Sequence, residues 1–500
     1  MNLTTEPSNQ LPDSATNPEA SLLPRLGLWT TVALVVGGVI GSGIFLKPAQ
    51  MALQLGSPML LLGVWIFAGV MTLFGALTNA EIAAMIPQTG GQYIFFQKMY
   101  GNLVAFFYGW AMFAVIFTGG VASIAYGFSE YLQHFVVLYR FPPEIERTLV
   151  VPLPFIGNIF PLANIGVKIL TIAIIGLLTA VNYRSVDAGG AVQNIFTALK
   201  ILAILALIVF ALSAKEGSWS NLVHNAPHHA LSPGDNHSPW GLIAACVGAL
   251  SGAFWAYDGW NNITYIAGEV KEPQRTIPRA LWMGLLITTG VYVLINLAYL
   301  FVLPIERIAA SPLVASETAQ AVMGNIGGGF IALAVMISTF GTTNGNILAG
   351  ARLYYAMARD GMFFRRVGYL HHTFRTPAFS LVAQALWTSV LVISGSFDML
   401  TDMLIFVSWI FYALGAFGVF VLRKKMPQTA RPYRVWGYPV IPAVFCIFAF
   451  GFVAVTLYND ITSFQSGVSP VITSVLGLVL VAMGLPFYWY FGRQKRAATR

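Results

Sequence analysis

Long apolar stretches recur along almost the whole chain, separated by short polar segments. A helix that crosses a bilayer needs roughly 20 predominantly apolar residues. The pattern predicts twelve transmembrane helices, near 27–53, 58–86, 101–135, 161–182, 190–213, 240–267, 278–303, 327–358, 377–396, 399–422, 439–459 and 469–491. We therefore expect an all-α membrane protein.

Composition strengthens this prediction. Hydrophobic residues make up 57% of the 500-residue chain and charged residues only 9%, whereas soluble domains carry roughly 25% charged residues. Because so few charges cannot cover a water-exposed surface of this size, lipid must cover most of it. The net charge is +8, but the basic residues are spread over short loops, which argues against a nucleic-acid partner.

The basic residues also predict an orientation. If the N-terminus is cytosolic, most of the 27 Lys and Arg fall in inward loops and tails, as the positive-inside rule requires. We expect polar cytosolic tails at 1–25 and 492–500 and a plasma-membrane location. The outward set is Lys47, Arg140, Arg147, Lys168, Lys215 and Arg307. The outer loop 214–239 also holds His224, His228, His229 and His237, which we interpret as solvated side chains rather than a metal or pH site.

Two spans are interrupted by residues that weaken a helix. The first contains Gly41-Ser42-Gly43, and each glycine costs about 1 kcal/mol relative to alanine. Alone, this segment is also compatible with close helix packing, because Gly37 and Gly41 form a GxxxG pair. The sixth span carries Asp258-Gly259, and a charge inside a span indicates function. Glycine-interrupted spans at matching positions of two halves point to a transporter site, so we expect both helices to be broken.

The broken helices predict the type of ligand. A half-helix starting near Ser42–Gly43 presents free N–H groups and the positive end of its dipole, which suit a carboxylate. Half-helices ending near Val39–Ile40 and near Trp255–Ala256 present free carbonyls, which suit an ammonium. Anion and cation sites this close together match a zwitterionic α-amino acid.

Four stretches carry a resemblance to a known family. They are VGGVIGSGIF at 36–45, AEIAAMIP at 80–87 with GGQY at 90–93, AYDGWNN at 256–262 with GEVKEP at 268–273, and GARLYYAMARDG at 350–361. With these, the chain resembles the L-amino acid transporter family of the amino acid–polyamine–organocation superfamily. The resemblance implies sodium-independent transport by alternating access, often as one-for-one exchange. The residues show no metal motif, and we expect no cofactor and no metal.

The resemblance also implies a fold and a site. The fold is a LeuT-type 5+5 inverted repeat over 26–213 and 240–422, with discontinuous first and sixth helices and two further helices in 438–491. By analogy, substrate binds at Val39, Ile40, Gly41, Ser42, Gly43, Trp255, Ala256 and Asp258.

Two departures from the better-known members affect substrate choice. Those members have Phe at the place of Trp255 and Gly at the place of Asp258. The larger indole favours small or mid-sized neutral substrates. Asp258 either hydrogen-bonds the broken backbone or adds negative charge near the amine. The second role would make this a cationic amino acid or polyamine carrier, and that alternative stays open.

Cysteine usage bears on partners. Eukaryotic members of the resembled family join a heavy subunit through a cysteine between spans three and four, and the loop 136–160 has none. The only cysteines, Cys246 and Cys446, lie in apolar segments. We therefore expect a stand-alone protein of a bacterial inner membrane, whose partners are its amino acid substrate and the lipid bilayer.

Two charged residues inside spans invite specific hypotheses. Lys200 lies roughly ten residues, or about 15 Å, into the fifth span. It either snorkels to the interface or serves transport coupling, because in the resembled family this lysine takes the place of an ion in sodium-coupled relatives. Whether it acts as a fixed cation or exchanges a proton is left open. We expect Glu81 to pair with an arginine of an inner loop.

The sequence lacks the characteristic motifs of metalloproteases, nucleotide-binding proteins and ion channels. The chain has no HExxH and no Walker A motif, and no filter repeat of the kind that ion channels use. We therefore expect a transporter rather than an enzyme, working as an exchanger or as a proton-coupled carrier.

Overall fold

The computed structural model describes residues 26–88, 90–184, 188–226 and 238–498, with backbone only at 188–198 and 494–498. The predicted tail 1–25 and the loop residues His228, His229 and His237 lie outside the described residues. His224 is exposed and its ring Nδ1 lies 2.8 Å from the carbonyl of Ser220.

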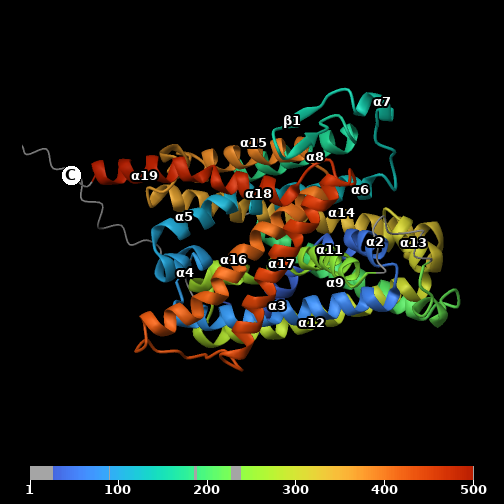
Figure 1. Ribbon diagram of the computed structural model, residues 1–500, viewed down its shortest axis with the longest axis horizontal. Coiled ribbons are helices and arrows are strands. Elements are labelled where there is room, and N and C mark those ends of the chain that lie inside the picture. Colours follow the sequence, from blue (N-terminus) through green and yellow to red (C-terminus); the bar gives the residue numbers. More distant parts are fainter. Residues whose placement is uncertain (1–25, 89, 185–187, 227–237, 499–500) are drawn as a thin grey trace, which may run out of the picture.

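The described helices follow the apolar pattern of the chain. They are α1 (Leu28–Val39), α2 (Gly43–Leu55), α3 (Pro58–Met85), α4 (Gly91–Tyr100), α5 (Asn102–Ala111), η1 (Met112–Ile116), α6 (Phe117–Leu132), α7 (Pro143–Glu146), α8 (Ile165–Arg184), α9 (Ala188–Leu212), η2 (Trp219–Leu222), α11 (Pro239–Tyr257), η3 (Trp260–Glu269), α12 (Pro273–Val302), α13 (Ile305–Ala310), α14 (Val314–Arg359), η4 (Arg365–Gly368), α15 (Ala378–Ser394), α16 (Phe397–Lys425), α17 (Val440–Gln465), α18 (Thr473–Ala482) and α19 (Gly484–Ala498). The hairpin pairs β1 (Val151–Leu153) with β2 (Gly157–Ile159) in antiparallel register, with Val151 opposite Ile159. Several long helices, among them α3, α12 and α19, run along the long axis of the molecule, and the short hairpin lies beside α7 and α8 (Figure 1).

Among the described residues, nine helices are long and apolar enough to cross a membrane, and ten if α1 and α2 form one bent span. Two shorter apolar helices, at Leu199–Leu212 and Ala378–Ser394, overlap the fifth and ninth predicted spans. The all-helical architecture of a multi-pass membrane protein is therefore confirmed. The count of twelve spans and the inverted-repeat topology remain predictions.

The outer surface of the bundle is apolar. Large side chains such as Phe67 on α3, Leu386 on α15 and Ile447 on α17 are exposed. The interior holds aromatic clusters, for example Trp409 against Phe254 with ring centroids 4.0 Å apart. An exposed apolar face around a packed aromatic core is the arrangement that a lipid solvent favours.

The third predicted span is a helix with a π-helical turn in its middle. The turn η1 lies between α5 and α6, and π-bulges of this kind are frequent at functional sites. Side chains of neighbouring helices donate to carbonyls of this turn: Trp387 donates to Ala114 at 2.8 Å and Tyr354 donates to Met112 at 3.2 Å. The turn is thereby held in place by α14 and α15.

Glu81, at the end of α3, forms a buried ion pair. Its carboxylate accepts two hydrogen bonds from the guanidinium of Arg423 on α16, at 2.9 and 2.7 Å, and a third from the backbone N–H of Val435 at 2.8 Å. Arg431 lies 3.5 Å away. The prediction that Glu81 pairs with an arginine is confirmed, and the cluster ties α3 to α16 and to the segment that follows it.

We expect Glu81→Gln to lower the free energy of unfolding by roughly 2–3 kcal/mol. This is below the 3–5 kcal/mol of a fully buried broken pair, because the Arg423 side chain is 25% exposed. The measurement is thermal melting of the purified protein in detergent. The control is Glu272→Gln, since its pair with Arg275 is mostly exposed and surface pairs contribute little. Equal melting of the two variants would contradict the prediction.

Candidate functional site

The first predicted break lies where the glycine-rich segment indicated. Helix α1 ends at Val39, Ile40 has an extended backbone (φ −69°, ψ 99°), and α2 begins at Gly43. The two halves meet at an angle of 44°. The backbone N–H groups of Phe45 and Leu46 both donate to the carbonyl of Ser42, so the N–H groups before them have no partner within α2.

The second predicted break is also present. Helix α11 ends at Tyr257, Asp258 is extended, and Gly259 has φ +93° before the 3-10 helix η3 begins. A Cβ on Gly259 would lie 2.9 Å from the carbonyl oxygen of Gly38. Glycine is therefore required at this position both by its left-handed backbone and by the close approach of the two breaks.

Tyr292 of α12 holds both breaks. Its hydroxyl lies 2.8 Å from the carbonyl oxygen of Ala256 and 3.1 Å from that of Val39, so its single O–H is shared between the ends of α11 and α1. The backbone N–H of Gly41 bonds to its oxygen. Sequence reasoning did not identify Tyr292, because a tyrosine in an apolar span has no local feature that reveals such a role.

Lys200 of α9 meets the first break from the other side. Its ammonium donates to the carbonyl of Gly37 at 2.8 Å and also to the carbonyl of Ile40. The side chain is 3% exposed. Because its charged end is directed at the broken helix rather than at a surface, this geometry excludes the snorkelling interpretation.

A cavity lies between the two breaks, with a free volume of about 780 Å³ including its opening. Of the predicted site residues, those that line it are Val39, Gly41, Ser42, Gly43, Trp255 and Asp258. Ile40 and Ala256 do not line it, and their carbonyls face Lys200 and Tyr292 instead.

The carboxylate of Asp258 is already engaged by the protein. It accepts a hydrogen bond from the hydroxyl of Tyr412 on α16 at 2.6 Å and another from the backbone N–H of Gly259. Of the two roles considered for Asp258, this geometry favours the hydrogen-bonding one, in which the carboxylate fixes the second break.

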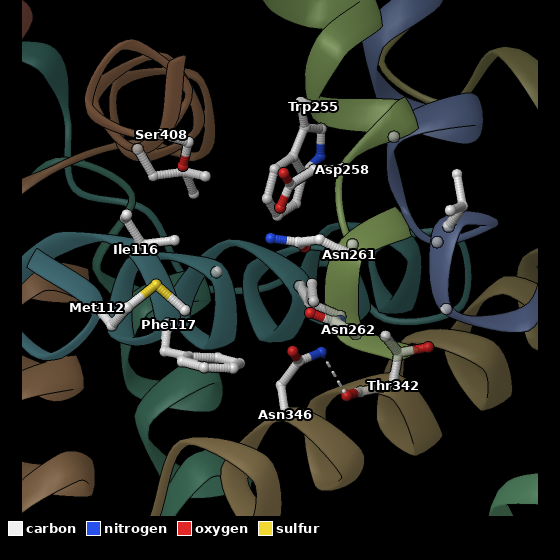
Figure 2. Close-up of a pocket in the computed structure, with 18 of the residues that line it drawn as sticks. Met112, Ile116, Phe117, Trp255, Asp258, Asn261, Asn262, Thr342, Asn346 and Ser408 are labelled. Carbon is white, nitrogen blue, oxygen red and sulfur yellow. Dashed lines mark hydrogen bonds between the residues drawn. The ribbon is translucent and has the colours of Figure 1, made fainter. Parts of the chain in front are cut away.

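The remaining wall combines apolar and polar side chains that the sequence analysis did not assign to the site. Met112, Ile116 and Phe117 come from η1 and the start of α6, while Asn261, Asn262, Thr342, Asn346 and Ser408 come from η3, α14 and α16 (Figure 2). Asn261 and Asn262 follow the predicted break directly. Thr342, Asn346 and Ser408 lie on distant helices, where nothing in the sequence relates them to the break.

A buried lysine forms a cluster of ion pairs with two partly exposed carboxylates. The ammonium of Lys47 on α2 lies 2.6 Å from Asp398 and 3.7 Å from Asp402, both on α16, and Asp402 accepts from Ser251 of α11 at 2.8 Å. The Phe397 ring lies 5.0 Å below this ammonium and 6.3 Å from the Trp255 ring. These contacts join α2, α11 and α16.

Two lysines of the predicted outward set lie inside helices rather than in outer loops. Lys47 lies inside α2 and is fully buried. Lys168 lies inside α8, and its ammonium donates to the carbonyls of Phe160, Pro161 and Ile393. Each ammonium has at least one partner that is distant in the sequence, Asp398 for Lys47 and Ile393 for Lys168, and a hydropathy pattern does not contain such contacts.

The sequence also matches a family of known proteins. The chain matches the amino acid permease family over residues 26–481. It is 30% identical to the serine/threonine exchanger SteT of Bacillus subtilis, over 96% of this chain and 98% of that protein. It is 31% identical to the large neutral amino acids transporter small subunit 2 of Mus musculus, over 96% and 84%. It is 29% identical to the cystine/glutamate transporter of Homo sapiens, over 95% and 86%.

We expect Gly43→Ala to destabilise the protein, because the new Cβ would lie 2.6 Å from the Cα of Ala256 and force α2 away from α11. Overpacking of this kind costs about 1–3 kcal/mol. The measurement is thermal melting in detergent. Gly63→Ala on α3 is the control, since its Cβ meets nothing within 4 Å. If both variants melt alike, the two breaks are not in close contact.

Proposed function

The chain belongs to the amino acid permease family, in its L-amino acid transporter branch, and we propose that it exchanges neutral L-amino acids across the membrane without sodium. The observation that carries the proposal is the pair of broken helices around one cavity. At their breaks, unpaired N–H groups at the start of α2 lie close to the carbonyl ends of α1 and α11. This pairing of opposite backbone polarity fits the zwitterion that all α-amino acids share.

In the proposed complex, the substrate carboxylate accepts from the backbone at the start of α2 and from the hydroxyl of Ser42. Its ammonium donates to carbonyl oxygens near Val39 and Trp255, which retain lone pairs for a further donor. Ile40 and Ala256 contribute by stabilising the non-helical backbone of the breaks, since their carbonyls accept hydrogen bonds from Lys200 and Tyr292.

Neutral substrates are favoured over cationic ones. The carboxylate that a cationic side chain would need is Asp258, and it already accepts from Tyr412 and Gly259. Two of the relatives are named for serine and threonine or for large neutral amino acids, which supports the same choice. A cationic or polyamine carrier is therefore the less supported alternative.

The transport cycle that we propose is alternating access within twelve spans, arranged as two inverted five-helix repeats over 26–213 and 240–422. Opening toward one side requires α2, α11 and α16 to separate, and this breaks the contacts of Lys47 with Asp398 and Asp402. Lys200 couples this motion to the first break. Its fixed positive charge at the carbonyls of Gly37 and Ile40 takes the place of an ion, which makes sodium unnecessary.

We propose a location in a bacterial inner membrane, with both termini in the cytoplasm and no disulfide-linked subunit. The loop between α6 and α8 contains no cysteine. The free thiols of Cys246 and Cys446 lie on α11 and α17. The partners are therefore the amino acid substrate and the surrounding lipid.

The decisive experiment is counterflow in proteoliposomes that contain the purified protein and are preloaded with one amino acid at a time. We expect labelled neutral L-amino acids to enter only vesicles preloaded with a neutral L-amino acid, with equal rates in sodium and potassium buffers. A parallel series with an imposed proton gradient separates exchange from proton coupling. A requirement for sodium, or faster uptake of lysine and arginine than of any neutral amino acid, would contradict the proposal.

We expect Lys200→Ala to reduce turnover by roughly 5- to 150-fold, because two buried carbonyls lose their donor and the first break relaxes. This range corresponds to the loss of about 1–3 kcal/mol for an unpaired buried group. The measurement is the initial rate of counterflow at equal protein content. Lys215→Ala, on an exposed loop, is the control. Unchanged turnover of Lys200→Ala would remove the coupling role while leaving the substrate site in place.

A further inference from the structure

Helices α8 and α15 are neighbours that run in opposite directions, and a hydrogen bond joins them near each end. At one end, the ammonium of Lys168 on α8 donates to the carbonyl of Ile393 on α15 at 3.0 Å. At the other end, the hydroxyl of Thr376, just before α15, donates to the carbonyl of Tyr183 on α8 at 2.8 Å. Both helices lie at the edge of the bundle (Figure 1), and neither contributes a residue to the wall of the substrate cavity.

Each of the two helices exposes an apolar stripe whose members recur every three or four residues, which is the spacing of one helix face. The stripe on α8 comprises Ile169, Ala173, Leu177 and Val181. The stripe on α15 comprises Phe379, Val382, Leu386 and Val390. In a membrane-spanning protein, exposed apolar side chains of this kind contact lipid acyl chains.

An exposed arginine lies at the same end of both stripes. Arg184 is the last residue of α8 and follows Val181 by three positions, while Arg375 precedes Phe379 by four. The hydrogen bond between Thr376 and Tyr183 joins the residues next to these two arginines, so both guanidinium groups start from adjacent parts of the backbone. Under the orientation that we propose, this end of the helix pair faces the cytoplasm.

The two arginines have no acidic partner within the described part of the chain, where the ion pairs involve other residues. Arg375 also has a left-handed backbone, with φ +57°, and its N–H donates to the carbonyl of His371 at 2.9 Å. Glycine would be less strained at this position, so only the side chain gives arginine an advantage there. The ring of Phe374 is 40% exposed beside it and stacks on His371, with ring centroids 4.7 Å apart.

We propose that this end of α8 and α15 binds one anionic phospholipid of the cytoplasmic leaflet. Arg184 and Arg375 bind the headgroup phosphate, because the guanidinium fork matches phosphate oxygens in a bidentate way. The acyl chains lie along the two apolar stripes, and the exposed ring of Phe374 adds apolar contact at the level of the headgroup. Basic sites between membrane helices on the cytoplasmic side are suited to such headgroups.

Charge and apolar surface together select this ligand. A free phosphate ion would meet the two arginines but would leave both apolar stripes without a partner. A zwitterionic phospholipid would cover the stripes, but its headgroup brings an ammonium toward two arginines that have no carboxylate beside them. A headgroup with net negative charge is the better electrostatic match. The bound lipid would join α8 to α15 in addition to the hydrogen bond between Tyr183 and Thr376.

The test is native mass spectrometry of the full-length protein in detergent, titrated with phosphatidylglycerol or with phosphatidylcholine of the same acyl chains. We expect one phosphatidylglycerol to bind roughly tenfold more tightly than phosphatidylcholine. The double variant Arg184→Gln with Arg375→Gln should weaken phosphatidylglycerol binding roughly 30-fold, because it removes both basic groups from the headgroup site. Arg184→Lys with Arg375→Lys keeps the charge and should retain most of the preference for phosphatidylglycerol.

The charge-matched control is Arg275→Gln with Arg279→Gln, which removes two exposed arginines from the start of α12 and should leave the affinity almost unchanged. Equal binding of the two lipids by the unmodified protein would overturn the site, and so would equal weakening by the two glutamine pairs, since binding would then follow net charge alone. If inorganic phosphate displaces phosphatidylglycerol, the arginines bind a free anion and the lipid site is also overturned. The comparison of lipids in the unmodified protein and the lysine variant decide the question even if the glutamine pair at α8 and α15 does not fold.

Discussion

A helix broken inside a membrane span exposes carbonyls that have lost their intrahelical donors, and the rest of the site depends on how those carbonyls are satisfied. In a lipid-covered protein water does not supply the missing donors. Here Lys200 donates to Gly37 and Ile40, and Tyr292 serves Val39 and Ala256. Two side chains from α9 and α12 thus make both breaks compatible with a dry interior.

This arrangement provides hydrogen-bond partners for the carbonyls of the two breaks but not for the N–H groups at the start of α2. The carbonyl ends of α1 and α11 receive donors from the protein, while the N–H groups at the start of α2 keep no partner within their helix. A helix N-terminus with unpaired N–H groups and a positive dipole end attracts an anion. In the site that we propose, the substrate carboxylate would meet N–H groups without a helical partner, whereas its ammonium would share carbonyls that already accept from the protein. Asp258, fixed by Tyr412, supplies negative charge nearby without being free to move.

Packing keeps the two breaks at contact distance. Gly259 lies against the carbonyl of Gly38, and Gly43 lies against Ala256, so neither position has room for a Cβ. On one side the Lys47 cluster joins α2, α11 and α16, and on α3 the Glu81 cluster holds α16 and the segment beyond it. Since α16 takes part in both clusters and also supplies Ser408 and Tyr412 to the cavity, movement of this helix would change the site and both ion-pair clusters together.

The sequence by itself determined the features that depend on local residue chemistry. Apolar length predicted the spanning helices, glycine and an intramembrane carboxylate located both breaks to within two residues, and a buried-charge argument marked Lys200 and Glu81. Only the tertiary structure decided which residues are partners. It shows that Tyr292 contacts both breaks and that Lys47 is buried against α16 rather than exposed in a loop. It also shows that the carbonyls of Ile40 and Ala256 face Lys200 and Tyr292, and that Ser408 lies across the cavity from Trp255. The physical reason is that helix breaking is set by backbone preferences of neighbouring residues, whereas a hydrogen bond between helices depends on how segments hundreds of residues apart pack together.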